Sequence, residues 1–213
     1  MSAEHIRFFF DPICPWCYQT SRWVRLLEDL GEVELSWGLF SLELVNEGNA
    51  EASAKGHARS APALRTARLL GERHDRGAVG AFYAAHGKAV HEGGEDVDDL
   101  RVIDDALAAA GYDPATRVAA LDDPGTWERV RAEHEELVER TRSFGVPTIA
   151  LDDGAGPAIF GPVISEVPDA ETAVELFRHV AWLARYENFS ELKRERTVDP
   201  PLASVRRFRR ARA

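Results

Sequence analysis

The chain has 213 residues, of which 45% are hydrophobic and 29% are charged, so it is long enough to bury a full core. Its formal net charge of −10 argues against a general nucleic-acid binder. No apolar run reaches the ~20 residues that a membrane-spanning helix needs, so we expect no membrane partner. Residues 1–5 carry no basic or leader-like apolar stretch. We therefore expect a cytoplasmic protein, in which paired cysteines are usually catalytic rather than structural.

The two cysteines of the chain, Cys14 and Cys17, lie two residues apart at a predicted strand–helix junction. The apolar residues 6–10 before them predict a buried strand, and residues 16–30 after them repeat apolar side chains at helical spacing. The unpaired N–H groups and the positive dipole end of such a helix favour a thiolate over a thiol. Thiols in CxxC settings of this kind have pKa values lowered to roughly 3.5–7.5. The pair therefore predicts a thiol–disulfide oxidoreductase.

Two other uses of the cysteine pair are less favoured. A structural zinc site normally needs four ligands, and the chain has no second cysteine pair. His86 and His91 lie far along the chain without a strong ligand pattern, so we predict no metal. A structural disulfide would close too short a loop to remove much entropy from the unfolded chain. The histidines of the predicted helices are expected to be hydrogen-bonded or exposed: His57, His74, His86, His91 and His134.

After the first helix, residues 33–39 alternate apolar and polar side chains and predict a second strand. Strand, helix and strand in this order form a βαβ unit, in which the two strands are parallel. From residue 46 to residue 141 the periodicity is helical. The predicted helices cover residues 62–74, 79–90, 97–110, 114–121 and 126–141. Their predicted caps are Ser60, Asp96 and Thr126 at N-termini and Gly111 at a C-terminus.

Strand character returns at residues 147–151 and 158–160, and the glycine-rich connection between them predicts a β-hairpin. Residues 169–184 then form a strongly amphipathic final helix. The order of these elements is that of an α/β protein with a thioredoxin-like fold, DsbA-like in carrying an inserted all-helical domain.

This order of elements predicts three parts of the chain. The thioredoxin-like domain is expected to be split between residues 1–45 and 142–190, with the helical insertion domain over residues 46–141. Residues 191–213 form a C-terminal extension. Its basic residues 206–212 are expected to be solvated and partly disordered.

A resemblance to a known family rests on four stretches: Phe9-Phe10-Asp11-Pro12-Ile13-Cys14-Pro15-Trp16-Cys17, Ser41-Leu42-Glu43-Leu44-Val45-Asn46-Glu47, Phe160-Gly161-Pro162-Val163-Ile164-Ser165, and Glu191-Leu192-Lys193-Arg194-Glu195-Arg196-Thr197. They span most of the chain. Together they resemble the DsbA-like thioredoxin superfamily. The second and fourth stretches point to its actinobacterial branch of mycothiol-dependent reductases, which includes mycothiol-dependent nitroreductases.

The resemblance implies roles for the residues of the cysteine motif. Cys14 would be the attacking thiol and Cys17 the resolving thiol. Trp16 would flank the active site, and Pro15 would belong to the same substrate-facing segment.

Three further residues are implied to lie at the site. Asn46 would approach it from the start of the insertion, although a helix-cap or turn role is the alternative for this residue. The Val146–Pro147 bond would be cis, with Pro147 against the cysteines and the backbone of Val146 free to hydrogen-bond an extended partner. The alternative for Pro147 is an ordinary edge-strand proline.

The resemblance also implies mycothiol as the reducing co-substrate, with no cofactor bound, and a homodimer. The substrates would be disulfides or electrophilic small molecules, nitroaromatic compounds among them. Two alternatives use the same fold: a DsbA-type oxidative folding catalyst, which needs an oxidising compartment, and a thiol-dependent isomerase or transferase, which typically lacks the intact pair. A partner-binding module without activity would leave the CxxC motif unexplained.

Overall fold

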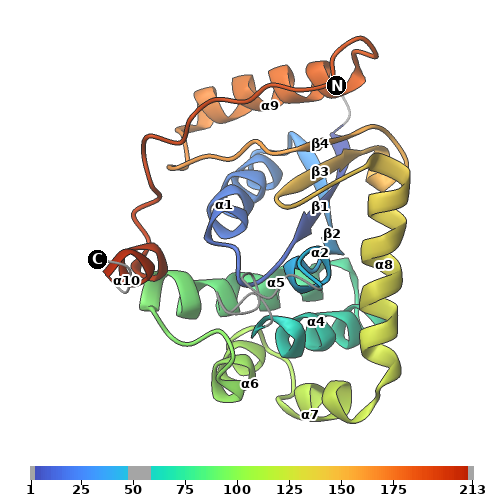
Figure 1. The fold of residues 1–213 in the computed structure, drawn as a ribbon, viewed down its shortest axis with the longest axis vertical. Coiled ribbons are helices and arrows are strands. Elements are labelled where there is room, and N and C mark those ends of the chain that lie inside the picture. The colour runs from blue at the N-terminus through green and yellow to red at the C-terminus, as the bar shows by residue number, and fades with distance from the viewer. Residues whose placement is uncertain (1–2, 48–58, 211–213) are drawn as a thin grey trace.

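The computed structural model describes residues 3–47 and 59–210, which form a mixed sheet surrounded by helices (Figure 1). The strand order is β2-β1-β3-β4, and β1 is buried on both faces, since Phe8, Phe9 and Phe10 are all at most 3% exposed. β1 runs parallel to β2, whereas β3 is antiparallel to both β1 and β4, so the predicted βαβ unit and hairpin are confirmed. The strands are β1 (Glu4–Phe10), β2 (Val33–Leu39), β3 (Thr148–Leu151) and β4 (Ala158–Phe160).

Helix α1 (Pro15–Asp29) begins inside the cysteine motif. Pro15 occupies the first helical position, where a proline is favoured because its missing N–H would have no helical partner. The buried face of α1 includes Trp23 and Leu27, both 0% exposed. The indole Nε1 of Trp23 donates to the carbonyl of Ala173, 3.1 Å away, on helix α9 (Ala170–Arg185). α1 is therefore fixed against α9, and its N-terminus follows directly from β1.

Helices fill the described chain between β2 and β3, and Figure 1 shows α4 to α7 gathered below the sheet while α8 runs up one side. This is the predicted thioredoxin-like fold with a helical insertion. Its division at residues 46 and 141 stays a prediction. No described helix is both long and apolar enough to cross a membrane. The helices between β2 and β3 are α2 (Leu42–Val45), α4 (Ala61–Arg73), α5 (Arg76–Gly87), the π-helix η2 (Lys88–Gly93), α6 (Leu100–Ala109), α7 (Ala115–Asp122) and α8 (Gly125–Thr141).

Two of the predicted N-caps are wrong. Asp99, not Asp96, caps α6 by accepting the backbone N–H of Arg101 at 2.9 Å, because the Asp96 carboxylate pairs with Arg59 instead. α8 begins at Gly125, and the hydroxyl of Thr126 donates to the carbonyls of Ala120 and Asp123. In both cases the side chain binds another partner and does not cap its helix.

Helix α5 packs on the sheet through aromatic side chains. The ring of Tyr83 stacks on Phe10 of β1 with 3.8 Å between centroids, and it meets Trp37 of β2 edge-on at 5.7 Å. The guanidinium of Arg25 from α1 lies 4.2 Å from the centroid of Trp37. Gly80 permits this approach, because a Cβ at that position would lie 2.4 Å from Nε1 of Trp37.

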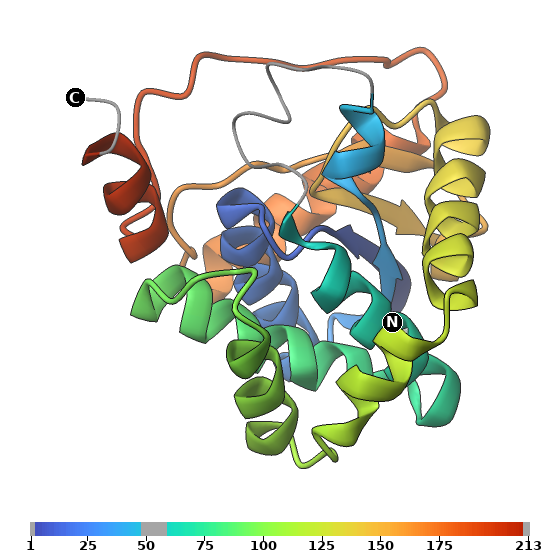
Figure 2. The ribbon, with the colours of Figure 1, turned by 60° about the horizontal axis from the view of Figure 1, so that its bottom comes forward.

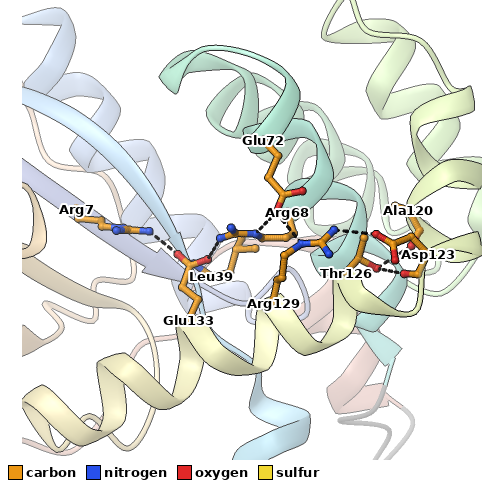
Figure 3. Close-up of polar contacts among 9 residues, drawn as sticks. All are labelled: Arg7, Leu39, Arg68, Glu72, Ala120, Asp123, Thr126, Arg129 and Glu133. Carbon is orange, nitrogen blue, oxygen red and sulfur yellow. Dashed lines mark hydrogen bonds and ion pairs between the residues drawn. The ribbon is translucent and has the colours of Figure 1, made fainter.

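A second joint between sheet and insertion centres on Glu133 of α8, whose side chain is 10% exposed (Figure 3). Its Oε1 accepts from Arg7 of β1 at 2.5 Å and from the backbone N–H of Leu39 at the end of β2 at 3.0 Å. Its Oε2 accepts from Arg68 of α4 at 3.2 Å. One carboxylate therefore ties two strands and two helices together.

The C-terminal extension departs from the prediction of a disordered end. Beyond α9 the chain runs as an extended segment across the molecule and then forms helix α10 (Ala203–Arg210) (Figure 2). The expected disorder is therefore wrong for residues 206–210, although these residues are exposed, as predicted; residues 211 and 212 lie outside the described residues. Leu202, directly before α10, is only 2% exposed, and α10 packs against η2. Arg207 also donates to the carbonyl of Gly94 at 3.1 Å. The burial of Leu202 and the hydrogen bond from Arg207 to Gly94 hold this basic segment in place.

Replacing Glu133 with alanine should destabilise the protein by about 2–4 kcal/mol, because two half-buried guanidinium groups and a backbone N–H lose their acceptor. The measurement is the free energy of unfolding from urea titration. Glu135→Ala on the same helix is the matched control, since that side chain is 57% exposed and pairs with Arg131 only at 3.9 Å. We expect the control to stay within about 0.5 kcal/mol of the parent protein. Equal losses in the two variants would contradict the role of Glu133.

Candidate active site

Cys14 directly precedes helix α1, where the chain leaves β1. The backbone N–H of Cys14 donates to the carbonyl of Asp11 at 3.0 Å, which closes a turn over residues 11–14. Cys14 is the N-cap residue of α1, with φ −84° and ψ 110°, and its Sγ accepts the backbone N–H of Cys17 at 3.4 Å. Cys14 is 8% exposed and Cys17 is 0% exposed, and both are free thiols. The first sulfur can therefore meet a reactant while the second lies behind it.

The two thiols have opposite acidity. A hydrogen bond from the Cys17 thiol lowers the pKa of Cys14, and the backbone N–H groups of Cys17 and Trp16 act in the same direction against the cost of burial. Burial raises the pKa of Cys17 well above its ordinary value, and its interactions with Cys14 raise it further. Cys14 is thus the more acidic of the two thiols and the better suited to act as a nucleophile, whereas Cys17 favours its protonated form.

The Val146–Pro147 peptide bond is cis, as predicted, and lies beside the cysteines. The Sγ of Cys14 is 3.9 Å from the carbonyl oxygen of Val146, so this loop contacts the thiol directly. A second cis bond, Gly161–Pro162, is a feature that the sequence analysis did not predict. The carbonyl of Pro162 accepts from the hydroxyl of Thr20 on α1 at 2.9 Å, so this loop also contacts the helix that carries the cysteines.

Trp16 is half-buried beside the pair, and the C-terminal extension reaches it. The guanidinium carbon of Arg196 lies 5.1 Å from the centroid of the Trp16 ring, within the range of a cation–π contact. The extension is fixed near this point by Ser165, whose hydroxyl donates to the carbonyl of Val198 at 2.6 Å. Residues far apart in the sequence therefore form one wall beside the motif.

Asp11 is a site residue that the sequence analysis missed. Its side chain is 0% exposed, and its carboxylate accepts the backbone N–H of Ile13 at 3.0 Å and that of Leu42 at 2.7 Å. Burial raises the pKa of Asp11 from 3.8 to about 6, although both N–H groups act to lower it. The sequence signal for this role is an acidic residue placed between the apolar strand and Pro12. A carboxyl buried at such a position needs hydrogen-bond donors around it.

Asn46 lies at the C-terminal cap of α2, the short helix that Asp11 contacts through Leu42. Its Nδ2 donates to the carbonyl of Leu42 at 2.6 Å. Within the described ranges, no hydrogen bond joins Asn46 to either cysteine. Its amide nitrogen is thus engaged in the cap-like contact named as the alternative, while α2 itself is tethered to the cysteine turn.

The histidines do not form a metal site in the part of the chain that the structure describes. His134 accepts the backbone N–H of Ser41 at 3.4 Å, and His74 is exposed. For His86 the expectation is wrong: it is 0% exposed, and neither ring nitrogen has a hydrogen-bond partner among the described residues. Burial lowers its pKa from 6.5 to about 3, so the ring is neutral. His57 lies outside the described residues.

Comparison with known proteins places this geometry in a family. A model of the Rv2466c-like family, described as mycothiol-dependent nitroreductase Rv2466c, matches residues 13–194. The chain belongs to this family. It is therefore an oxidoreductase that uses thiol chemistry. This member is also 34% identical over 194 residues to the uncharacterized protein Rv2286c of Mycobacterium tuberculosis, with 90% of this chain and 82% of that protein covered.

Solved structures similar to this Rv2466c-like protein share its DsbA-like fold. The cytosolic disulfide reductase DsbM from Pseudomonas aeruginosa has a TM-score of 0.58 at 17% identity, with 84% of this chain and 100% of that chain covered. The oxidoreductase DsbA from Xylella fastidiosa has a TM-score of 0.53 at 17% identity, covering 85% and 86%. A 2-hydroxychromene-2-carboxylate isomerase has a TM-score of 0.58 at 18% identity, covering 85% and 96%. Reductase, DsbA and isomerase thus share one fold, which alone does not separate these activities.

The raised pKa of Asp11 predicts a pH-dependent stability. Between pH 4 and 6 the unfolded chain releases the Asp11 proton while the folded protein keeps it, so the parent protein loses stability as the pH rises. The Asp11→Asn variant has no titrating group at this position, so it does not show this loss of stability. We expect the difference in unfolding free energy, Asp11→Asn minus parent, to increase by about 2–3 kcal/mol from pH 4 to pH 6.5 and then to level off.

Urea unfolding at a series of pH values measures this difference. Asp169→Asn is the control of opposite sign, because Asp169 caps α9 and its hydrogen bonds to Thr172 lower its pKa. The difference in unfolding free energy, Asp169→Asn minus parent, should fall as the pH rises. A flat difference for Asp11→Asn would show that its carboxyl does not titrate in this range.

Proposed function

We propose that the protein is a cytoplasmic thiol–disulfide oxidoreductase whose Cys14–Cys17 pair is reduced by mycothiol. The observation that carries the proposal is the asymmetric pair: a partly accessible Cys14 at a helix N-terminus, with a fully buried Cys17 behind it. Membership of a family described as mycothiol-dependent supports the choice of thiol. Its acceptors would be disulfides or electrophilic small molecules, nitroaromatic compounds among them.

The oxidation of the pair delivers two electrons. The Cys14 thiolate attacks one sulfur of a disulfide substrate, which forms a mixed disulfide and expels the other sulfur as a thiolate that takes up a proton. Cys17 then loses its proton and attacks Cys14. The mixed disulfide breaks, the second substrate thiol leaves, and the Cys14–Cys17 disulfide forms. With a nitro group as acceptor, the same two electrons and two protons give a nitroso group and water.

Two molecules of mycothiol would restore the pair. The first attacks the Cys14–Cys17 disulfide at Cys14 and releases Cys17 as a thiol, leaving mycothiol bound to Cys14 through a mixed disulfide. The second attacks that mixed disulfide, frees the Cys14 thiolate and leaves as mycothiol disulfide. Attack at Cys14 is favoured because Cys17 is fully buried.

The surrounding residues have proposed roles in positioning the reactants. Pro15 fixes the start of α1, and the ring of Trp16 offers a flat surface beside the sulfur. The backbone of Val146, held next to Pro147, would hydrogen-bond the amide groups of a thiol bound at Cys14. Asn46 would contact substrate through its amide oxygen, since its Nδ2 is engaged by Leu42.

Thiol specificity can be tested by NADPH consumption in the presence of a disulfide acceptor, which reoxidises the Cys14–Cys17 pair in each turnover. The protein is coupled in parallel to mycothiol with its reductase and to thioredoxin with its reductase. We expect turnover with mycothiol alone and at least about a thousandfold loss in Cys14→Ser, since a nucleophile is removed. Turnover with thioredoxin alone would retain the dithiol chemistry and reject mycothiol. Turnover with neither would favour the oxidative folding catalyst or the isomerase.

Cys17→Ser should trap the first intermediate, because the resolving thiol is absent. We expect incubation of this variant with mycothiol disulfide to give one stable mycothiol adduct on Cys14, detected by intact-mass spectrometry and removed by dithiothreitol. Cys14→Ser is the matched control and should stay unmodified, since Cys17 is buried with a raised pKa. Modification of Cys17 in the control would reverse the assigned order of the two thiols.

A further inference from the structure

His91 lies behind the cysteine turn with both ring nitrogens engaged. It is part of the π-helix η2 and is 1% exposed. Its Nε2 is 3.0 Å from the carbonyl oxygen of Pro12, in the turn that leads into Cys14. Its Nδ1 is 3.0 Å from the hydroxyl of Ser204 on α10. One ring therefore connects the reactive turn to the C-terminal helix.

The chemistry of the two partners fixes the tautomer. A carbonyl oxygen can only accept, so Nε2 must carry the proton and donate to Pro12. Burial lowers the pKa of His91 to about 4, so the ring is neutral near pH 7 and Nδ1 is an acceptor. The hydroxyl of Ser204 must then be the donor to Nδ1. Ser204 thus stabilises the one neutral tautomer that can hold the Pro12 carbonyl.

Three elements orient the ring. The side chain of Tyr18 on α1 stacks on it, with 5.2 Å between centroids and 28° between planes, and the Tyr18 hydroxyl donates to Glu92 of η2 at 2.7 Å. Gly87 lets η2 approach α1 this closely, because a Cβ there would lie 2.3 Å from the Tyr18 ring. π-helical turns are frequent at functional sites. α1, η2 and α10 therefore enclose His91 on three sides.

The Pro12 carbonyl takes part in one of four hydrogen bonds that hold the same turn. Asp11 makes the other three, through its carbonyl to the N–H of Cys14 and through its carboxylate to the N–H groups of Ile13 and Leu42. The bonds to Cys14 and Ile13 are local to the turn, the bond to Leu42 joins it to α2, and the bond from His91 joins it to η2. Rotation of the Pro12 peptide would move Cys14 relative to the Cys17 N–H, which lies 3.4 Å from its sulfur.

We propose that His91 is a positioning residue for the Cys14 thiolate and that Ser204, brought by α10, holds His91 in this role. Docking of the C-terminal helix thereby sets the reactivity of the dithiol. Ser204 lies beyond residue 194, where the match to the family model ends. The inference rests on the thiol chemistry of the proposed function, but not on mycothiol or on any particular substrate.

The test measures Cys14 directly in the full-length reduced protein. The rate of alkylation by iodoacetamide from pH 4 to pH 9, with the site identified by mass spectrometry, gives the apparent pKa of Cys14. Equilibration in dithiothreitol redox buffers gives the reduction potential, and urea unfolding reports stability separately. The variants are His91→Phe, which keeps a ring to stack on Tyr18, His91→Gln, which keeps a donor near Nε2, and Ser204→Ala.

We expect His91→Phe to slow alkylation about fivefold at pH values below the pKa of Cys14, which is the effect of losing one hydrogen bond that orders the thiolate site. Ser204→Ala should change the profile in the same direction by a smaller factor, and His91→Gln should recover most of the parent rate. Two matched controls should stay within about twofold of the parent, as for residues outside such a network. They are His86→Phe, a buried histidine whose ring nitrogens have no hydrogen-bond partner among the described residues, and Arg210→Ala, an exposed residue of α10.

Parent-like alkylation profiles and potentials in both His91→Phe and Ser204→Ala would overturn the positioning role while leaving the dithiol function intact. If His91→Phe does not fold, Ser204→Ala decides alone, because it removes only one half-buried hydroxyl. A parent protein whose Cys14 reacts no faster than an ordinary thiol at neutral pH would instead contradict the proposed function itself. Loss of stability without a changed alkylation profile would assign His91 a structural role only.

Discussion

The turn from Asp11 to Cys14 is the constraint on which the reactive end of the molecule depends. It redirects the chain from a buried strand into a helix within four residues, and it leaves Cys14 as the N-cap of that helix. An N-cap side chain meets the unpaired backbone donors of the first turn, so a sulfur at this position is stabilised as an anion. The buried partner, Cys17, follows from the same geometry, since it lies one helical turn further into the core.

The helical insertion contributes to this turn rather than merely covering it. The Asp11 carboxylate reaches Leu42 at the entry to the insertion, and His91 reaches back to Pro12 from η2. Glu133 in turn joins β1 and β2 to α4 and α8. The sheet and the insertion therefore share buried hydrogen bonds, and a polar group that lost its partner in one of them would destabilise the fold. A shift of one part relative to the other would be felt at the cysteines.

The sequence allowed the local features of the site to be predicted, and failed where the partner lay far along the chain. The cysteine pair, the parallel strands and the cis bond before Pro147 follow from short patterns or from the family resemblance. The roles of Asp11 and Glu133 depend on partners 31 and 94 residues away, respectively, so no local pattern reports them. The C-terminal end was mispredicted for the same reason. Its arginines are exposed as predicted, but they indicate a disordered tail, whereas the burial of Leu202 and the hydrogen bond between Ser204 and His91 hold it as a helix against η2.

The full burial of Cys17 beneath Cys14 also bears on how the protein withstands peroxides. An oxidant from solvent meets Cys14 first and converts it to a sulfenic acid. A second thiol lies within the same helical turn, so condensation to a disulfide competes directly with further oxidation to the irreversible sulfinic acid. Because Cys17 is buried, its thiol is protected from direct oxidation by the solvent-borne oxidant. The packing that leaves Cys14 as the more accessible sulfur therefore favours an oxidised state that thiols can reverse.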